Sequence, residues 1–198
     1  DATTAVEDSD DNLSDVTTAT NGGSVVLRTT AGNLRITDGG DGDEVGVEAD
    51  QSGNVLLQSA AGTVELESTV MSGSGSISVI GAADVTQTAA GDITTGGGGT
   101  IDVEAQGGSA TMTDGATATT ADANIRYAAA QNVTLGGLDA GVSEVSVVAS
   151  AGNITDAGDV DVDVLADELR MDAGGDIGEP AGTSNGLLDT TINELAAA

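Results

Sequence analysis

The stretch AGNITDAGDVDVDVLADELRMDAGGDIG, residues 151–178, combines the two features that predict the fold of this chain. Aspartate and valine alternate strictly from Asp159 to Val164, and Gly-Asn and Gly-Asp pairs stand before and after this alternation. A period of two places one residue type on each face of a β-strand, and glycine next to Asn or Asp indicates a turn. We therefore expect a strand whose aspartates face water and whose valines face a core. A carboxylate ladder that binds divalent cations is the alternative interpretation of these aspartates.

The same alternation recurs in short segments along the chain. These segments are 24–30, 33–37, 54–59, 62–68, 76–80, 100–105, 132–135 and 143–148. In 100–105, for example, Ile101 and Val103 share one face while Asp102 and Glu104 share the other. Residues 163–171 could be drawn as a short helix, but the alternation runs directly into them, so we expect a strand there as well. The pattern predicts an all-β protein.

A tripeptide of glycine, Asn or Asp, and an aliphatic residue punctuates these segments. It begins at Gly32, Gly53, Gly91, Gly152 and Gly175. The successive gaps are close to one, two, three and one units of roughly 20 residues, a repeat length typical of solenoids. We expect glycine, Asn and Asp at corners because they tolerate left-handed backbone. The spacing predicts a single-stranded parallel β-helix with about 20 residues per coil and about eight or nine coils.

The composition agrees with a narrow interior. The chain has 198 residues, 30 of them glycine, and it contains no Phe, Trp, Cys or His. Tyr127 is the one aromatic residue. A two-layer core is normally filled by large aromatic side chains, so a thin column of Ala, Val, Ile, Leu and Thr suits this chain better. We predict an acidic N-terminal segment or linker over residues 1–22 and one β-solenoid domain over residues 23–198.

The charge of the chain excludes several classes of partner. The formal net charge is −29, and its four basic residues are all arginines. Nucleic acids and anionic membranes both require clustered positive charge, so we expect neither as a partner. No apolar run reaches about 18 residues, so no membrane span is expected. The chain begins at Asp1 without a signal peptide, and we interpret it as an excised or mature segment of something longer.

One acidic loop is a candidate metal site. DGGDGDE, residues 38–44, places Asp38, Asp41, Asp43 and Glu44 on a glycine-rich stretch. Ca²⁺ prefers six to eight oxygen ligands and flexible loops. The spacing does not complete an EF-hand, because Val45 stands where a further oxygen ligand belongs. The loop is therefore either a Ca²⁺ site or a solvated acidic turn, and no other cofactor is expected.

Catalysis is not expected. His and Lys are absent, the acids are spread along the chain, and GGGG at 96–99 lacks the lysine of a phosphate-binding loop. Paired carboxylates could hydrolyse glycosides at a suitable separation, but no aromatic platform for a sugar accompanies them. Ice binding would require a regular outward array of threonines, and the Thr-rich residues 110–120 are irregularly spaced.

Five glycine-punctuated segments resemble the repeat regions of filamentous-haemagglutinin-like exoproteins, which are large bacterial surface adhesins. These segments are 31–37, 52–59, 90–95, 150–155 and 173–182, and the closing LLDTTINELAAA, residues 187–198, is similar to a recurrent unit of such proteins. The resemblance implies a right-handed parallel β-helix, export, and a role on the cell surface or in a filament. The amino-terminal secretion domain of that family is not recognisable here.

These observations predict a structural role. We expect a repeat segment of an extracellular or cell-surface bacterial filament or adhesin that displays an acidic surface. Uncapped solenoid ends expose strand edges, so we expect copies or tandem repeats to stack head to tail. A receptor on a host or neighbouring cell is a further candidate partner. The alternative is a β-solenoid module that binds Ca²⁺ or carbohydrate.

Overall fold

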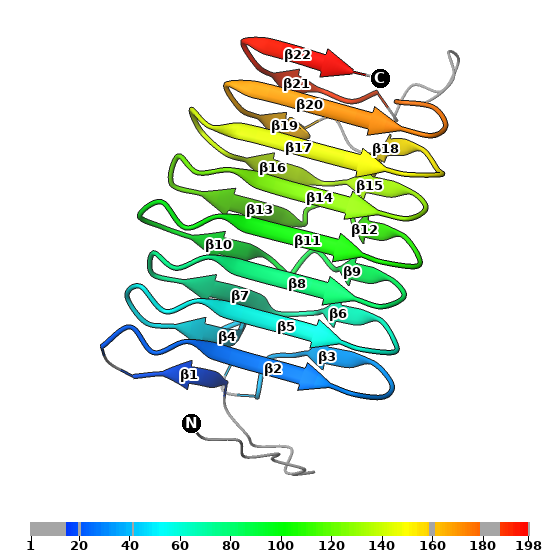
Figure 1. The fold of residues 1–198 in the computed structure, drawn as a ribbon. Helices are drawn as coiled ribbons and strands as arrows, with labels where there is room; N and C mark the ends of the chain where they lie inside the picture. Colours follow the sequence, from blue (N-terminus) through cyan, green and yellow to red (C-terminus); the bar gives the residue numbers. More distant parts are fainter. Residues whose placement is uncertain (1–14, 20, 41, 159–160, 179–186, 198) are drawn as a thin grey trace.

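The computed structural model describes residues 15–19, 21–40, 42–158, 161–178 and 187–197, and all of its regular elements are β-strands (Figure 1). Sheet A contains β1 (Val16–Thr18), β4 (Val45–Ala49), β7 (Thr69–Ser72), β10 (Ile93–Thr95), β13 (Thr117–Thr120), β16 (Gly137–Asp139), β19 (Val164–Leu165) and β21 (Thr190–Thr191). Sheet B contains β2 (Val25–Thr29), β5 (Val55–Ser59), β8 (Ile77–Gly81), β11 (Ile101–Ala105), β14 (Ile125–Ala129), β17 (Glu144–Ala149), β20 (Glu168–Ala173) and β22 (Glu194–Ala197). Sheet C contains β3 (Leu34–Ile36), β6 (Val64–Leu66), β9 (Val85–Gln87), β12 (Ala110–Met112), β15 (Val133–Leu135) and β18 (Ile154–Asp156).

The chain visits the three sheets in turn, which makes it a parallel β-solenoid. In sheets B and C, for example, β2 pairs with β5 and β3 pairs with β6, each in parallel. Followed upward in Figure 1, the chain runs left to right along sheet B in front and returns behind it along sheet A. That path is a right-handed coil. The predicted all-β, single-stranded parallel β-helix is confirmed.

The coil length expected from the tripeptide spacing is too short, because a turn contains roughly 24 residues. One inward column runs through Val25, Val55, Ile77, Ile101, Ile125, Val145, Leu169 and Leu195. Its members are unevenly spaced in the sequence, since the turn from Val25 to Val55 is the longest and the turn from Ile125 to Val145 is the shortest. The described residues form six complete three-strand turns plus partial turns, in place of the eight or nine coils expected.

The error in coil length comes from the punctuating tripeptide. Gly32 precedes β3 of sheet C, Gly53 precedes β5 of sheet B, and Gly91 precedes β10 of sheet A. The tripeptide therefore marks all three corners, and the gap between two occurrences need not be a whole number of turns. Between equivalent corners the spacing is regular, since Gly152 and Gly175, both at the corner that leads into sheet C, are separated by close to one turn.

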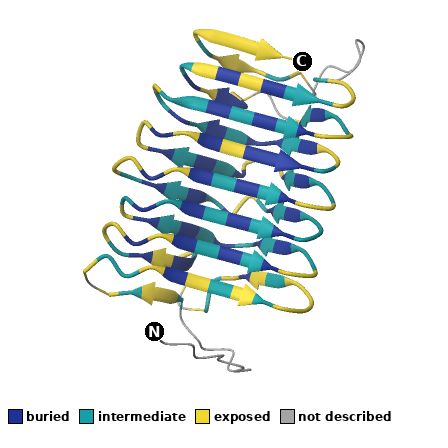
Figure 2. Ribbon diagram, in the orientation of Figure 1, coloured by how far each residue is buried: buried dark blue, intermediate teal, exposed yellow. Residues whose placement is uncertain are grey.

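The core is a slim column of aliphatic side chains. In Figure 2, where the ribbon is coloured by burial, the buried residues appear as dark stripes across the strands of sheet B from β5 to β20. Tyr127 lies inside this column, and its hydroxyl donates a hydrogen bond of 2.8 Å to Gln87 Oε1. Gln87 Nε2 in turn donates to the carbonyl oxygen of Thr117 at 2.7 Å. Burial raises the pKa of the Tyr127 hydroxyl above its ordinary value. The largest side chain is thus accommodated with its polar group satisfied.

Side-chain oxygens at the corners connect each rung to the next. At the corner that leads into sheet C, Asp84 Oδ1 accepts a hydrogen bond from the backbone N–H of Ser109 at 2.8 Å. Asn33, Asn132 and Asn153 accept equivalent bonds from Thr63, Asn153 and Asp176, at 3.0, 2.9 and 2.8 Å. The other two corners use the same device, with Asn54 accepting from Ser76 and Asp92 from Thr117, both at 2.8 Å. Backbone donors between strands are thereby satisfied.

The glycines of the tripeptide have a different role from the one expected. Among Gly32, Gly53, Gly91, Gly152 and Gly175, only Gly32 has a positive φ, of 76°. A Cβ at Gly175 would overlap Asn153 Oδ1 of the preceding rung, and a Cβ at Gly108, at the same corner, would overlap Asp84 Oδ1. Close approach between rungs thus requires glycine at most of these positions: a Cβ at Gly152 or Gly175 would overlap a capping side chain of the preceding rung, and a Cβ at Gly53 or Gly91 would overlap a backbone carbonyl oxygen.

The Asp-Val alternation that opened the sequence analysis is not a strand with an acidic face. Asp163 is only 2% exposed, whereas Val162 is 49% exposed, and β19 begins at Val164. Asp163 occupies the corner that leads into sheet A, where its Oδ2 accepts the N–H of Asp189 at 2.7 Å. Asp159 and Val160 lie outside the described residues. The strand expected within residues 163–171 is confirmed as β19 and the start of β20.

Two further observations concern the N-terminal segment and membrane-spanning helices. Strand β1 falls within the acidic N-terminal segment 1–22 and pairs in parallel with β4 through Val16 and Val47. The described part of the chain contains no helix long and apolar enough to cross a membrane.

A double-mutant cycle tests the coupling between the capping side chain and its glycine. Asp84→Ala should cost about 1 kcal/mol, because the Ser109 N–H loses its acceptor. Gly108→Ala should cost about 1–3 kcal/mol through overlap. The double variant should be more stable than the two costs predict, by about 1 kcal/mol, since the missing side chain leaves space for the new methyl group. Urea unfolding measures all four proteins. Ser78→Ala with Gly108→Ala is the additive control, and additivity for Asp84 and Gly108 would contradict the coupling.

Candidate functional site

A group of three carboxylates lies at the N-terminal end of the solenoid. Asp15, Asp38 and Asp43 each place a carboxylate oxygen within 4.8 Å of the other two. Asp15 directly precedes β1, while Asp38 and Asp43 lie in the loop between β3 and β4. The pairing of β1 with β4 therefore brings together residues that are far apart in the sequence.

The conformation of the loop positions two of these carboxylates. Asp43 Oδ1 accepts the backbone N–H of Val45 at 2.9 Å, and Asp38 Oδ1 accepts that of Gly40 at 3.4 Å. Such local hydrogen bonds are typical of Asp in turns. Three carboxylates supply three to six oxygens, and water or backbone carbonyls complete the shell of a Ca²⁺ ion in many loops. The group has the chemistry to hold a hard divalent cation.

The sequence predicted this site in part. Of the four candidates, Asp38 and Asp43 belong to the group, Glu44 is exposed and does not, and Asp41 lies outside the described residues. Asp15 was missed, because it belongs to the acidic segment 1–22 and no local motif connects it to the loop. The strand Val16–Thr18 directly follows Asp15 and is the feature that could have located it, because a strand must pair with a neighbouring strand. Ca²⁺ binding itself stays a prediction.

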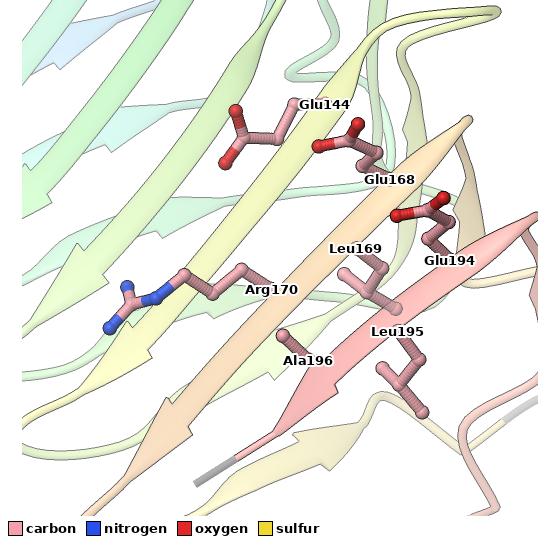
Figure 3. Close-up of a pocket in the computed structure, with 7 residues that line it drawn as sticks. All are labelled: Glu144, Glu168, Leu169, Arg170, Glu194, Leu195 and Ala196. Carbon is pink, nitrogen blue, oxygen red and sulfur yellow. The ribbon is translucent and has the colours of Figure 1, made fainter.

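A second acidic feature lies near the C-terminal end on sheet B. Glu144, Glu168 and Glu194 begin three successive strands in register and line a groove of about 200 Å³ (Figure 3). Leu169, Arg170, Leu195 and Ala196 complete the lining. Arg170 does not neutralise this column, because it pairs with Asp172 on its own strand at 2.8 Å. Like charges that are directly opposed on neighbouring strands are destabilising.

The glutamates replace a capping ladder. In earlier rungs of the same corner, Ser24 Oγ accepts the N–H of Asn54, and Asn124 Oδ1 accepts that of Glu144. Glutamate occupies the three positions that follow Asn124. At these three positions glutamate therefore stands where short polar side chains stabilise the earlier rungs, and negative charge accumulates on the surface.

Two other surface features are a groove on sheet A and a column of threonines on sheet C. A groove of about 380 Å³ on sheet A is lined by Thr117, Thr119, Gly137, Leu138, Asp139, Val162, Leu165 and Thr191. On sheet C, Thr86, Thr111, Thr134 and Thr155 form one in-register column. The Oγ1 atoms of Thr134 and Thr155 are 3.3 Å apart. This column was not evident from the sequence, because its members come from separate turns of unequal length.

Comparison with protein-family models, curated proteins and solved structures finds no significant match for this chain. The resemblance to filamentous-haemagglutinin-like repeats is therefore supported only at the level of architecture, as a β-solenoid repeat protein.

The carboxylate group at the N-terminal end can be tested with Ca²⁺. We expect Ca²⁺ to raise the melting temperature of the protein, since a ligand at one hundred times its Kd stabilises by about 2.7 kcal/mol. Asp38→Asn combined with Asp43→Asn should abolish most of this shift. Differential scanning calorimetry at matched ionic strength measures it. Glu48→Gln, an exposed acid outside the group, is the control, and an equal shift in all three proteins would remove the site.

Glu168, at the centre of the glutamate column, provides a second test. Glu168→Asn should raise the free energy of unfolding by about 0.5–1 kcal/mol, because it relieves repulsion from both neighbours. The gain should shrink in high salt, which screens exposed charges. Thermal unfolding at low and high NaCl measures both effects. Glu48→Asn, whose neighbours in register are Thr17 and Met71, should change little. A loss of stability in Glu168→Asn at low salt would show that the column is not repulsive.

Proposed function

We propose that this chain is a structural repeat segment of an extracellular bacterial filament or adhesin. Its role is to provide length and stiffness and to display an acidic surface, and it performs no catalysis. Successive copies or repeats continue the solenoid end to end. The observation that carries this proposal is the unbroken parallel stack, in which the column from Val25 to Leu195 passes through every strand of sheet B.

Solenoid geometry supports a role as a spacer. Each rung contacts only its neighbours, so length grows by about 4.8 Å per added turn without any change in the cross-section. The eight strands of sheet B within the described residues span about 34 Å on this spacing. Corner hydrogen bonds and a buried aliphatic column connect each rung to the next, and such contacts resist bending. The same unit can therefore be repeated to any length.

The distribution of charge supports exposure to a salty exterior. Three arginines form ion pairs with acids on the outer faces: Arg35 with Glu67, Arg126 with Asp102 and Glu104, and Arg170 with Asp172. The hydrogen bond from Arg35 lowers the pKa of Glu67. Because these three arginines are paired with acids, they neutralise only a few of the carboxylates, and the surface stays strongly acidic. Such a surface repels other anionic surfaces and prevents non-specific association, unless salt or divalent cations screen it.

A Ca²⁺- or carbohydrate-binding module is the second candidate function. The approach of Asp15 to Asp38 and Asp43 favours the Ca²⁺ version of this candidate. Binding a cation there would also stabilise the N-terminal rung, so this function is compatible with a structural role. A receptor on a host or neighbouring cell would recognise the outer faces of the sheets.

Immunogold electron microscopy of intact cells that produce the protein tests the proposed function. Antibodies raised against the 198-residue chain should label filaments or the cell surface without permeabilisation. Pre-absorbing the antibodies with the purified chain is the control, and it should remove the label. Label that appears only after permeabilisation would reject the extracellular filament or adhesin.

A further inference from the structure

Two buried carboxylates lie at the two ends of the connection between β18 and β19. Asp156 is the last residue of β18 and is 8% exposed, and Asp163 directly precedes β19 and is 2% exposed. Among the residues that the structure describes, these are the two charged side chains that are buried. Asp156 is in register with the fully buried Leu135, so its carboxylate occupies an inward position that the preceding turn fills with an aliphatic side chain.

The connection from sheet C to sheet A is longer here than in the preceding turn. Gly136 alone connects β15 to β16, whereas residues 157–163 connect β18 to β19. Asp156 Oδ1 accepts the backbone N–H of Gly158 at 2.8 Å, so the carboxylate is turned toward this connection. Insertions in single turns of a solenoid form loops on one face, and that face is often where ligands bind.

The second oxygen of Asp156 is not compensated within the described part of the chain. Asp156 Oδ2 is buried and accepts no hydrogen bond there. The chain has no lysine, and all four arginines are exposed. Three of these arginines pair with acids on the outer faces of sheets B and C. An isolated buried charge is strongly unfavourable, so buried carboxylates in proteins are paired with a positive charge or bind a metal ion.

We propose that Asp156 binds a Ca²⁺ ion at this corner and that Asp163 provides the second negative charge. Ca²⁺ is a hard cation that is bound by carboxylate, backbone carbonyl and water oxygens. Asp156 Oδ2 is the direct ligand. Asp163, whose Oδ2 accepts the N–H of Asp189 at 2.7 Å, contributes its charge from the other end of the connection. The two positive charges of the ion balance the two buried carboxylates.

This site is distinct from the carboxylate group of Asp15, Asp38 and Asp43. That group lies beside β1 and in the loop after β3, and β3 and β18 are at opposite ends of sheet C (Figure 1). Each site can therefore be removed without changing the other. The inference goes beyond the proposed spacer function, because it makes the stability of the β18–β19 turn depend on Ca²⁺.

Asp156→Asn tests the proposal in a background that carries Asp38→Asn and Asp43→Asn, so that the N-terminal group contributes no binding. Isothermal titration calorimetry with CaCl₂ should show Ca²⁺ binding to the background, and Asp156→Asn should weaken it at least about tenfold. In EGTA the order should reverse: Asp156→Asn should melt at or above the temperature of the background, because it removes an uncompensated buried charge. Hydrogen exchange in the background should slow within residues 154–165 when Ca²⁺ is added.

Asp139→Asn is the matched control, since Asp139 Oδ1 accepts the N–H of Gly141 in the same way, at 3.0 Å, from a half-buried position. It should bind Ca²⁺ like the background. Asp163→Asn keeps an acceptor for the Asp189 N–H and should also weaken binding, and circular dichroism establishes that each variant is folded. A background that does not bind Ca²⁺, or one whose affinity is unchanged by Asp156→Asn, would overturn the inference. The surface labelling described above does not depend on this site.

Discussion

The close contact between a short polar side chain and a glycine of the next rung is the constraint on which the rest of this structure depends. At the corner into sheet C, Asp84 accepts the N–H of Ser109 while Gly108 leaves space for the carboxylate. The contact satisfies a backbone donor and brings successive corners within van der Waals distance. The backbone ladder sets the rung spacing, and this contact helps to hold the register of the strands that follow. With the corners held in this way, small aliphatic residues are sufficient to fill the column between the sheets.

This constraint also explains why the surface is free to vary. Between the corners, outward side chains take no part in the core, so the same scaffold carries threonines on sheet C and ion pairs on sheet B. The glutamates at 144, 168 and 194 show how far this freedom extends, because they replace capping residues near one end of the stack. The proposed spacer function uses both properties: an interior that repeats without change, and an exterior that accumulates acid.

Particular residues show where sequence patterns were and were not sufficient. Alternation in 100–105 correctly placed Ile101 and Val103 in the core, because one face of a strand in a single-layer coil is always buried. The same rule failed for Asp163, since a corner can imitate alternation when its capping residue is an aspartate. The metal candidate was half predicted: Asp38 and Asp43 are neighbours in the loop, but Asp15 joins them only through the pairing of β1 with β4.

The sequence by itself determined that the chain is all-β, that its interior is thin and aliphatic, and that its surface is acidic. Those properties follow from local alternation, from composition and from charge, none of which requires a distant contact. Only the tertiary structure decided the coil length of roughly 24 residues, the role of the glycines and the membership of each outward column. The physical reason is that three corners use the same residues, so the period is visible only when each corner is assigned to its sheet. Columns are likewise defined by stacking between turns, and turns of unequal length conceal that register in the linear sequence.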